Sequence, residues 1–236
     1  MLNPWGSSDD FYLGLVLHAG SVLDIGCGTG QLLHHARDAG HNGRLCGIDP
    51  DEASLRVARR RTDVEWLSGT AASMTFESQF ELAVMSGHAF QFLVSDEDVR
   101  ESLAGITRAL VDGGRFVFDM RNPVARAWER WAREAPIDVV DASGRELRVW
   151  YGVDAVDADT VTVTETTAER DGTPLRVDKA RLRFLDIDTL ARLLAEAGFL
   201  VEAQYGGWSL EPLERSSPEI VTVARAAGQR RSHASG

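Results

Sequence analysis

The first half of the chain contains two kinds of apolar pattern, which follow one another in turn: short continuous runs and residues repeated at helical spacing. Short apolar runs have the length and composition of buried strands. They lie at 22–25, 44–49, 64–67, 81–85 and 115–120. Between them, three segments repeat apolar residues at helical spacing, at 31–39, 51–60 and 95–110. Strands that alternate with helices in this way predict a parallel, doubly wound α/β sheet.

The pattern changes to period two after about residue 137. Three alternating runs lie at 147–153, 160–167 and 175–184, and Ser143-Gly144 and Asp171-Gly172 provide hairpin turns before the first run and the third. This predicts an inserted antiparallel β layer. A core-type helix around Leu190 and Leu194 follows it, and then come two last strands. They lie at 200–205 and 219–224.

The chain begins with a loop and a short amphipathic helix, and its first strand leads directly into a loop of alternating glycines. Asp24 lies near the end of that strand, and the glycines are Gly26, Gly28 and Gly30. Glycines let the backbone turn sharply and approach a ligand closely. A loop that binds a pyrophosphate needs donors and positive potential, whereas a carboxylate just before the glycines favours a cation. S-adenosylmethionine, with its ammonium and sulfonium, fits this charge better than a dinucleotide does.

The glycine spacing favours the same cofactor. The dinucleotide fingerprint is G-x-G-x-x-G, but the glycines here follow G-x-G-x-G. With Asp24 ahead of them, they resemble the first motif of class I S-adenosylmethionine-dependent methyltransferases, D/E-x-G-x-G-x-G. The resemblance covers residues 1 to about 225. It implies a Rossmann-like, seven-stranded, mostly parallel sheet whose last strand runs antiparallel, and an insertion that serves as a substrate lid or dimer surface.

The chain is therefore expected to have four parts. These are a cofactor-binding α/β core with an N-terminal lid (1–134), an inserted antiparallel β subdomain (135–184), the return of the core (185–225) and a disordered tail (226–236).

Length, charge and cysteine content limit the kinds of molecule that this protein is expected to bind. The length of 236 residues suffices for one α/β domain with an insertion. The net charge of -11 argues against nucleic acids and anionic membranes. No apolar run spans a bilayer, and the N-terminus lacks a signal-peptide layout. Two cysteines, Cys27 and Cys46, form no disulfide framework. We expect a cytoplasmic protein with a small-molecule partner, no metal ion and a possible homodimer.

The cofactor residues follow from strand ends and from the resemblance. Asp49 ends the second strand, nineteen residues after Gly30, where an acidic residue accepts hydrogen bonds from ribose hydroxyls. The resemblance implies that Pro50 packs on the adenine. It also implies an acceptor for the adenine amino group where this chain has Thr70, with the backbone of Ala71 beside it. The expected cofactor residues are Asp24, Gly26, Cys27, Gly28, Gly30, Asp49, Pro50, Thr70, Ala71, Met85 and Ser86.

The loop after the fourth strand is expected to lie beside the acceptor, because ligands of open α/β sheets bind outside the carboxyl ends of the strands. His88 in this loop suits a general base at neutral pH; the alternative is a histidine that only orders the loop. Asp119 and Arg121 end the fifth strand, where they could bind a polar substrate. The resemblance implies that aromatic residues near the N-terminus, Trp5 and Tyr12, close over the cofactor.

These features predict in-line transfer of a methyl group from S-adenosylmethionine to an oxygen or nitrogen of a small molecule. Three alternatives stay open. They are a methyltransferase that acts on RNA or protein, a cofactor-binding module without catalysis, and a nicotinamide oxidoreductase, which the glycine spacing disfavours.

Overall fold

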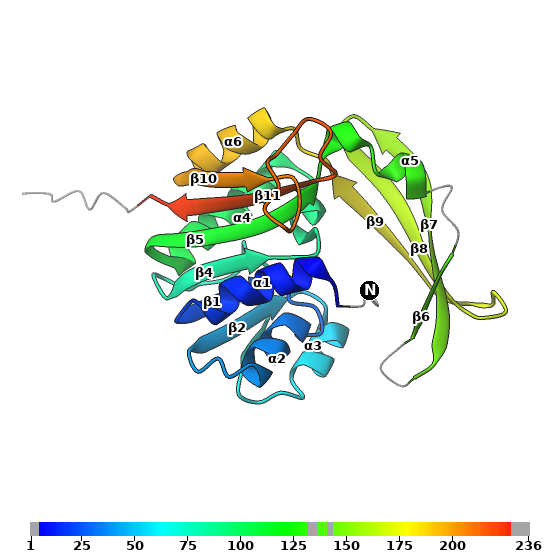
Figure 1. Cartoon of the computed structure of the whole chain (residues 1–236), viewed down its shortest axis with the longest axis horizontal. Coiled ribbons are helices and arrows are strands. Elements are labelled where there is room, and N and C mark those ends of the chain that lie inside the picture. Colours follow the sequence, from blue (N-terminus) through cyan, green and yellow to red (C-terminus); the bar gives the residue numbers. More distant parts are fainter. Residues whose placement is uncertain (1–4, 132–135, 141–143, 228–236) are drawn as a thin grey trace, which may run out of the picture.

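The computed structural model describes residues 5–131, 136–140 and 144–227. Its main sheet has seven strands in the order β10-β11-β5-β4-β1-β2-β3 (Figure 1). The strands are β1 (Ser21–Ile25), β2 (Arg44–Asp49), β3 (Glu65–Ser68), β4 (Phe80–Met85), β5 (Leu110–Arg121), β10 (Phe199–Tyr205) and β11 (Glu219–Ala226). Strands β1 to β5 pair in parallel, whereas β11 runs antiparallel between β5 and β10. The expected seven-stranded, mostly parallel sheet is confirmed.

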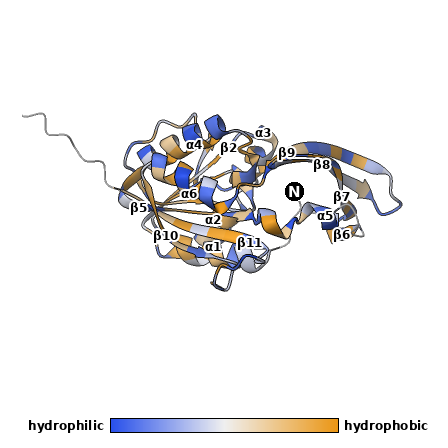
Figure 2. Cartoon of the chain, turned by 90° about the horizontal axis from the view of Figure 1, so that it is seen from above, coloured by the Kyte–Doolittle hydropathy of each residue, from blue (hydrophilic) through white to orange (hydrophobic). Residues whose placement is uncertain are grey.

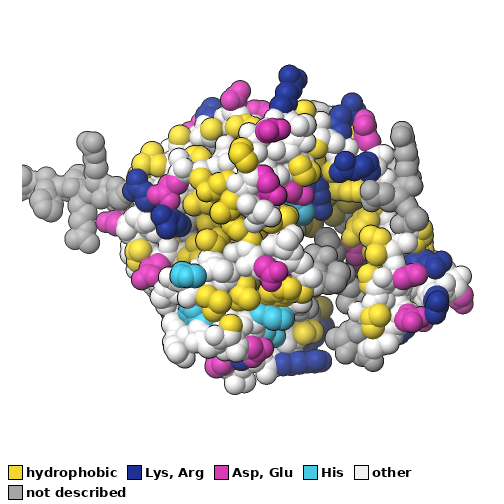
Figure 3. All heavy atoms as spheres, viewed as in Figure 1, with side chains coloured by type: hydrophobic (Ala, Val, Ile, Leu, Met, Phe, Trp, Pro, Cys, Tyr) yellow, Lys and Arg dark blue, Asp and Glu magenta, His cyan; other side chains and the backbone are white. Residues whose placement is uncertain are grey.

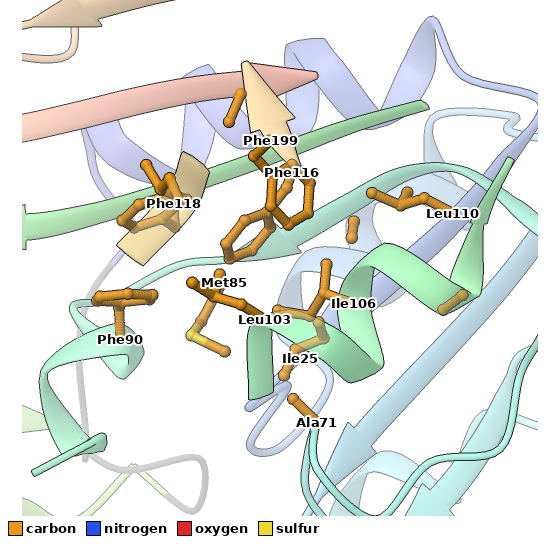
Figure 4. Close-up of a cluster of buried hydrophobic side chains, with 14 of the residues drawn as sticks. Ile25, Ala71, Met85, Phe90, Leu103, Ile106, Leu110, Phe116, Phe118 and Phe199 are labelled. Atoms are coloured by element: carbon orange, nitrogen blue, oxygen red, sulfur yellow. The ribbon is translucent and has the colours of Figure 1, made fainter. Parts of the chain in front are cut away.

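Helices cover both faces of this sheet. They are α1 (Ser7–Leu17), α2 (Gln31–Asp38), α3 (Glu52–Ala58), α4 (Asp96–Ala109) and α6 (Ile187–Glu196). Alternate strand residues point to opposite faces, so Val22 packs with α1 and α2 while its neighbour Leu23 packs with α4 and α6. Figure 4 shows the second of these clusters, where Phe116 and Phe118 of β5 stack on each other. None of the described helices is long and apolar enough to cross a membrane.

The inserted layer is a separate antiparallel sheet of β6 (Ile137–Val140), β7 (Glu146–Asp157), β8 (Thr160–Glu169) and β9 (Pro174–Arg183). It confirms the period-two prediction. Two short helices, η2 (Pro123–Ala125) and α5 (Trp128–Trp131), connect it to β5. In Figures 1 and 2 this curved sheet stands beside the edge of the core at which the parallel strands end. It is therefore positioned to cover a ligand bound at that edge.

The first helix follows a loop, as predicted, and begins at Ser7. The Asp9 side chain accepts a hydrogen bond from the N–H of Gly6 (2.8 Å) and caps the helix start. Asp112-Gly113-Gly114, whose residues favour a tight turn, lies instead inside β5, where the pairing with β4 shifts register between Phe80 and Leu82. Ser143 and residues 228–236 lie outside the described residues.

Candidate active site

Four backbone N–H groups of the glycine loop between β1 and α2 already donate hydrogen bonds within the protein. Gly26 and Cys27 donate to the carbonyl of Ile48 (2.8 and 3.2 Å), and Gly30 donates to the carbonyl of Cys27 (2.9 Å). The N–H of Gly28 donates to Asp49 Oδ2 at 2.7 Å. A pyrophosphate site needs such groups free. The loop therefore does not fit a dinucleotide.

Glycine is required at two of these positions. Gly28 has φ +54° and open space around it, so a ligand can reach the backbone there. Gly30 has φ +79°, and a Cβ on it would lie 2.4 Å from the ring of Trp66. A side chain at Gly30 would push the ring out of its place behind the loop.

Asp24 is a buried carboxyl group beside the loop, and one of its oxygens has no hydrogen-bond donor among the described residues. Its side chain is 2% exposed, and Oδ1 is buried with no hydrogen-bond partner among the described residues. Burial, together with the nearby charge of Asp49, raises the pKa of Asp24 to about 7. A buried carboxylate oxygen without a donor fits a ligand that brings a cation or an N–H group. The ammonium of S-adenosylmethionine meets this requirement.

Asp49 connects the loop to the next strand. One carboxylate oxygen accepts from Gly28, and the other accepts from the N–H of Asp51 at 2.8 Å. Asp51 in turn caps α3 by accepting from the N–H groups of Ala53 and Ser54. Pro50 beside them is exposed. Asp49 therefore holds the loop, and its carboxylate oxygens keep lone pairs that can accept further hydrogen bonds.

Replacing Asp49 by alanine is expected to weaken the binding of S-adenosylhomocysteine by about 10–100-fold, because hydrogen bonds to a charged group are worth about 1.5–3 kcal/mol. Isothermal titration calorimetry measures this. Asp51→Ala is the matched control: it loses a helix cap, about 1 kcal/mol of stability, and should keep its affinity within about twofold. Equal affinities for Asp49→Ala and the natural protein would remove Asp49 from the site.

The other predicted cofactor residues lie along the same edge. Thr70 is exposed, and its N–H donates to Ser73 Oγ at 2.9 Å. The side chains of Ala71 and Met85 belong to the core, so only their backbone groups remain for a ligand. Ser86 is half-buried. Burial raises the pKa of the Cys27 thiol, which marks it as unreactive.

His88 is fixed at both its backbone and its ring. It has the left-handed conformation, with φ +61°, and its N–H donates to Asp119 Oδ2 at 2.8 Å. Ring atom Nε2 lies 2.9 Å from Glu219 Oε2, and the side chain is 19% exposed. The carboxylate of Glu219 favours the proton on Nε2, which leaves Nδ1 as the acceptor in the neutral ring. This arrangement suits a general base.

Asp119 is buried beneath the loop of His88 and accepts a hydrogen bond from its N–H, so its side chain does not face solvent. It is 0% exposed, and the Tyr12 hydroxyl donates to its Oδ1 at 2.5 Å. Burial raises the pKa of Asp119, and burial with the adjacent carboxylate raises that of Tyr12 well above its usual range. The expected substrate contact of Asp119 and lid role of Tyr12 are therefore wrong, because both side chains are closed into the core.

Trp5 also lies elsewhere than expected. Its ring packs on His35 of α2, with centroids 3.9 Å apart, and its Nε1 donates to Asp10 at 2.7 Å. These contacts hold it against α1 and α2. The structure thus shows Trp5 as a packing residue of this face of the core.

Tyr12→Phe is expected to cost about 1–3 kcal/mol of unfolding free energy, because the buried Asp119 loses a donor. Thermal or urea denaturation measures the change. Since the same carboxylate holds the N–H of His88, turnover should fall together with stability. A variant as stable as the natural protein would show that the 2.5 Å contact contributes nothing.

A cavity of about 290 Å³ opens between the His88 loop and the inserted sheet. Figure 3 shows a hollow between the core and the inserted sheet. The core contributes Gly87, His88 and Arg121, and α5 contributes Trp131. The inserted sheet contributes Tyr151, Val163, Glu165, Arg176, Asp178, Lys179, Ala180 and Leu182. Trp128 and Trp131 both pack on Phe184, and Trp131 also lines the cavity.

The His88 loop, which lines the cavity, also lies against the glycine loop. A Cβ built on Gly26 would lie 3.2 Å from the Cβ of Ala89, the residue after His88. The strand order and the carboxylates that end β1 and β2 agree with the resemblance of the glycine motif to class I S-adenosylmethionine-dependent methyltransferases.

Comparison with known proteins supports this class. Residues 22–114 match the family model described as a methyltransferase domain. The chain is 35% identical over 117 residues to a 2-phytyl-1,4-naphtoquinone methyltransferase of Thermosynechococcus vestitus, covering 47% of this chain and 51% of that protein. It is 27% identical to a cypemycin N-terminal methyltransferase of a Streptomyces species, covering 86% and 82%. The chain thus spans about half the length of the first relative.

Solved structures share the fold over nearly the whole chain. An S-adenosylmethionine-dependent methyltransferase of Clostridium acetobutylicum superimposes with a TM-score of 0.78 at 14% identity, covering 96% of this chain and 93% of that one. The sugar N-methyltransferase KedS8 of a Streptoalloteichus species gives 0.69 at 16% identity, covering 94% and 88%. The comparisons thus show a methyltransferase domain at residues 22–114 and, over nearly the whole chain, the fold of S-adenosylmethionine-dependent methyltransferases.

Sequence reasoning missed several residues of the site. Glu219 orients the His88 ring, Gln91 holds Arg121, and Tyr151 and Glu165 line the cavity. One signal was present for Glu219. An antiparallel last strand starts at the edge where the parallel strands end, so its first residue belongs to the site. The other three residues carry no comparable signal.

Proposed function

We propose that this chain transfers the methyl group of S-adenosylmethionine to a nitrogen or oxygen atom of a small molecule bound in the cavity. The observation that carries this proposal is that the Gly26 loop lies against the loop of His88, and that His88 lines the cavity. The cavity volume of about 290 Å³ lies at the small end of the ~300–1,000 Å³ range of small-molecule sites. That size fits a compact acceptor.

The residues of the chain divide the work between binding and proton transfer. When bound, S-adenosylmethionine supplies a methyl group on a sulfonium, ready for in-line displacement. Asp24 and Asp49 hold the donor, and the inserted sheet excludes water from the acceptor. Holding two reactants in line contributes about 7–11 kcal/mol. His88 Nδ1 takes the proton that the acceptor loses, while Glu219 fixes the ring.

A nitrogen acceptor is favoured over oxygen. The cypemycin enzyme is named for an N-terminal methylation and KedS8 for a sugar N-methylation. Each of them aligns with most of this chain. A base beside the cavity suits an amine, which must shed a proton to become neutral and nucleophilic.

Incubating the protein with methyl-labelled S-adenosylmethionine and a panel of small amines and phenols tests the proposal. Mass spectrometry should detect a methylated amine and an equal amount of S-adenosylhomocysteine. Tight cofactor binding with no methylated product would favour the binding module instead. Methylation confined to added RNA or protein would favour a macromolecular acceptor.

A further inference from the structure

We propose that the acceptor carries a carboxylate group and that Arg121 binds it. This inference rests on the proposed function and specifies its substrate class. Arg121 ends β5 and lines the cavity together with His88. It places a fixed positive charge where the acceptor must bind.

Arg121 differs from the other cations of the cavity in its partners. Arg176 pairs with Asp178 at 2.5 Å, and Lys179 pairs with Asp154 at 3.2 Å. In the part of the chain that the structure describes, no carboxylate lies within ion-pair distance of Arg121. Its only hydrogen-bond acceptor there is the side-chain carbonyl of Gln91, at 3.1 Å from Nη1.

The carboxylates nearest to Arg121 have other partners. Glu219 is the register partner of Arg121 across the β5–β11 pair, but it contacts the ring of His88. Asp119, two residues before Arg121, accepts from Tyr12 and from the N–H of His88. Arg121 therefore keeps donors for a ligand.

The guanidinium is also held in a fixed plane. It lies over the ring of Trp131, 4.8 Å from the centroid, while Gln91 fixes one edge. Gln91 is 1% exposed, and its own amide donates to the carbonyl of Arg183 at 3.0 Å. A planar fork fixed in this way matches the two oxygens of a carboxylate. Burial lowers the pKa of Arg121, an effect that a bound anion would reverse.

A carboxylate fits the cavity better than a phosphate does. Glu165 also lines the wall, and Glu219 adjoins it through His88. These acidic groups would repel a dianion more strongly than a monoanion. The remaining wall includes Phe92, Val163 and Leu182, which suits an apolar body. The acceptor class is thus an amino or hydroxy carboxylic acid with an apolar side group.

The test compares matched acceptors with and without the charge. Apolar amino acids and their amides are offered to the natural protein and to Arg121→Gln, Arg121→Lys and Arg148→Gln. The last is a control, since Arg148 is paired with Asp138 and lies outside the cavity. We expect kcat/KM for the acids to exceed that for the amides at least tenfold. Arg121→Gln should abolish this preference by raising KM for the acids.

Arg121→Lys, which keeps the charge but loses the fork, should retain part of the preference and so show that folding is intact. Amides methylated as well as acids, with no effect of Arg121→Gln, would overturn the inference and leave the proposed function standing. If no acceptor is methylated, the inference is tested by calorimetry, which measures the binding of benzoate and of benzamide to the S-adenosylhomocysteine complex. Benzoate binding that Arg121→Gln removes supports the inference, and no benzoate binding overturns it.

Discussion

Replacing His88 by asparagine is expected to lower turnover by about 10²–10⁴-fold, because the acceptor loses its general base. Asparagine is chosen because it tolerates the left-handed backbone of this position, φ +61°. Affinity for S-adenosylhomocysteine should stay within about twofold, since His88 faces the acceptor cavity. Steady-state turnover with a methylated acceptor, together with calorimetry, measures both quantities.

His88→Ala should lose turnover by the same order and also some stability, because alanine pays for positive φ. Glu219→Gln is the informative companion variant. It removes the carboxylate that fixes the ring but leaves the imidazole, so it should shift the pH profile of kcat more than the affinity for the acceptor. Turnover close to that of the natural protein in His88→Asn would reduce His88 to a residue that orders the loop.

Replacing Asp24 by asparagine is expected to have two opposite effects, weaker cofactor binding and a more stable free protein at pH 8. The pKa of Asp24 is about 7 in the folded chain, against an ordinary value of 3.8. Between these two values only the folded state holds the proton, so stability falls as pH rises through this window. Above pH 7 the ionised carboxylate costs the folded state about 4 kcal/mol.

Asparagine carries no such charge, so the melting temperature of Asp24→Asn should exceed that of the natural protein by roughly 10 °C at pH 8. Near pH 4 the two proteins should melt together, since Asp24 is then protonated in the folded state. The comparison across pH controls for the change of side chain itself. Equal melting temperatures at pH 8 would show that the buried charge is compensated within the protein.

Sequence reasoning predicted the parts of the fold that local pattern determines. Apolar runs of strand length and a glycine at each tight turn are local signals. The pattern from Val22 to Gly30 therefore predicted the first strand and the glycine loop, and the next apolar run correctly placed Asp49 at the end of the second strand. The exact start of α1 at Ser7 depends on the contact between Gly6 and Asp9, which apolar periodicity does not record.

Residues positioned by pairing between distant segments could not be predicted in the same way. The Tyr12–Asp119 contact joins residues 107 positions apart, and the His88–Glu219 contact joins residues 131 positions apart. Aromatic residues near the N-terminus are compatible both with a lid and with a core. Tyr12 belongs to the core because its hydrogen-bond partner, Asp119, is buried there.

The central claim is that Asp24 receives the cationic amino acid end of S-adenosylmethionine. Calorimetric titration of S-adenosylmethionine into the natural protein and Asp24→Asn at pH 8 tests it most directly. We predict a Kd at least tenfold higher for the variant, consistent with the loss of about 1.5–3 kcal/mol from a charged hydrogen bond. A Kd within twofold of the natural protein, measured on a folded variant, would contradict the claim.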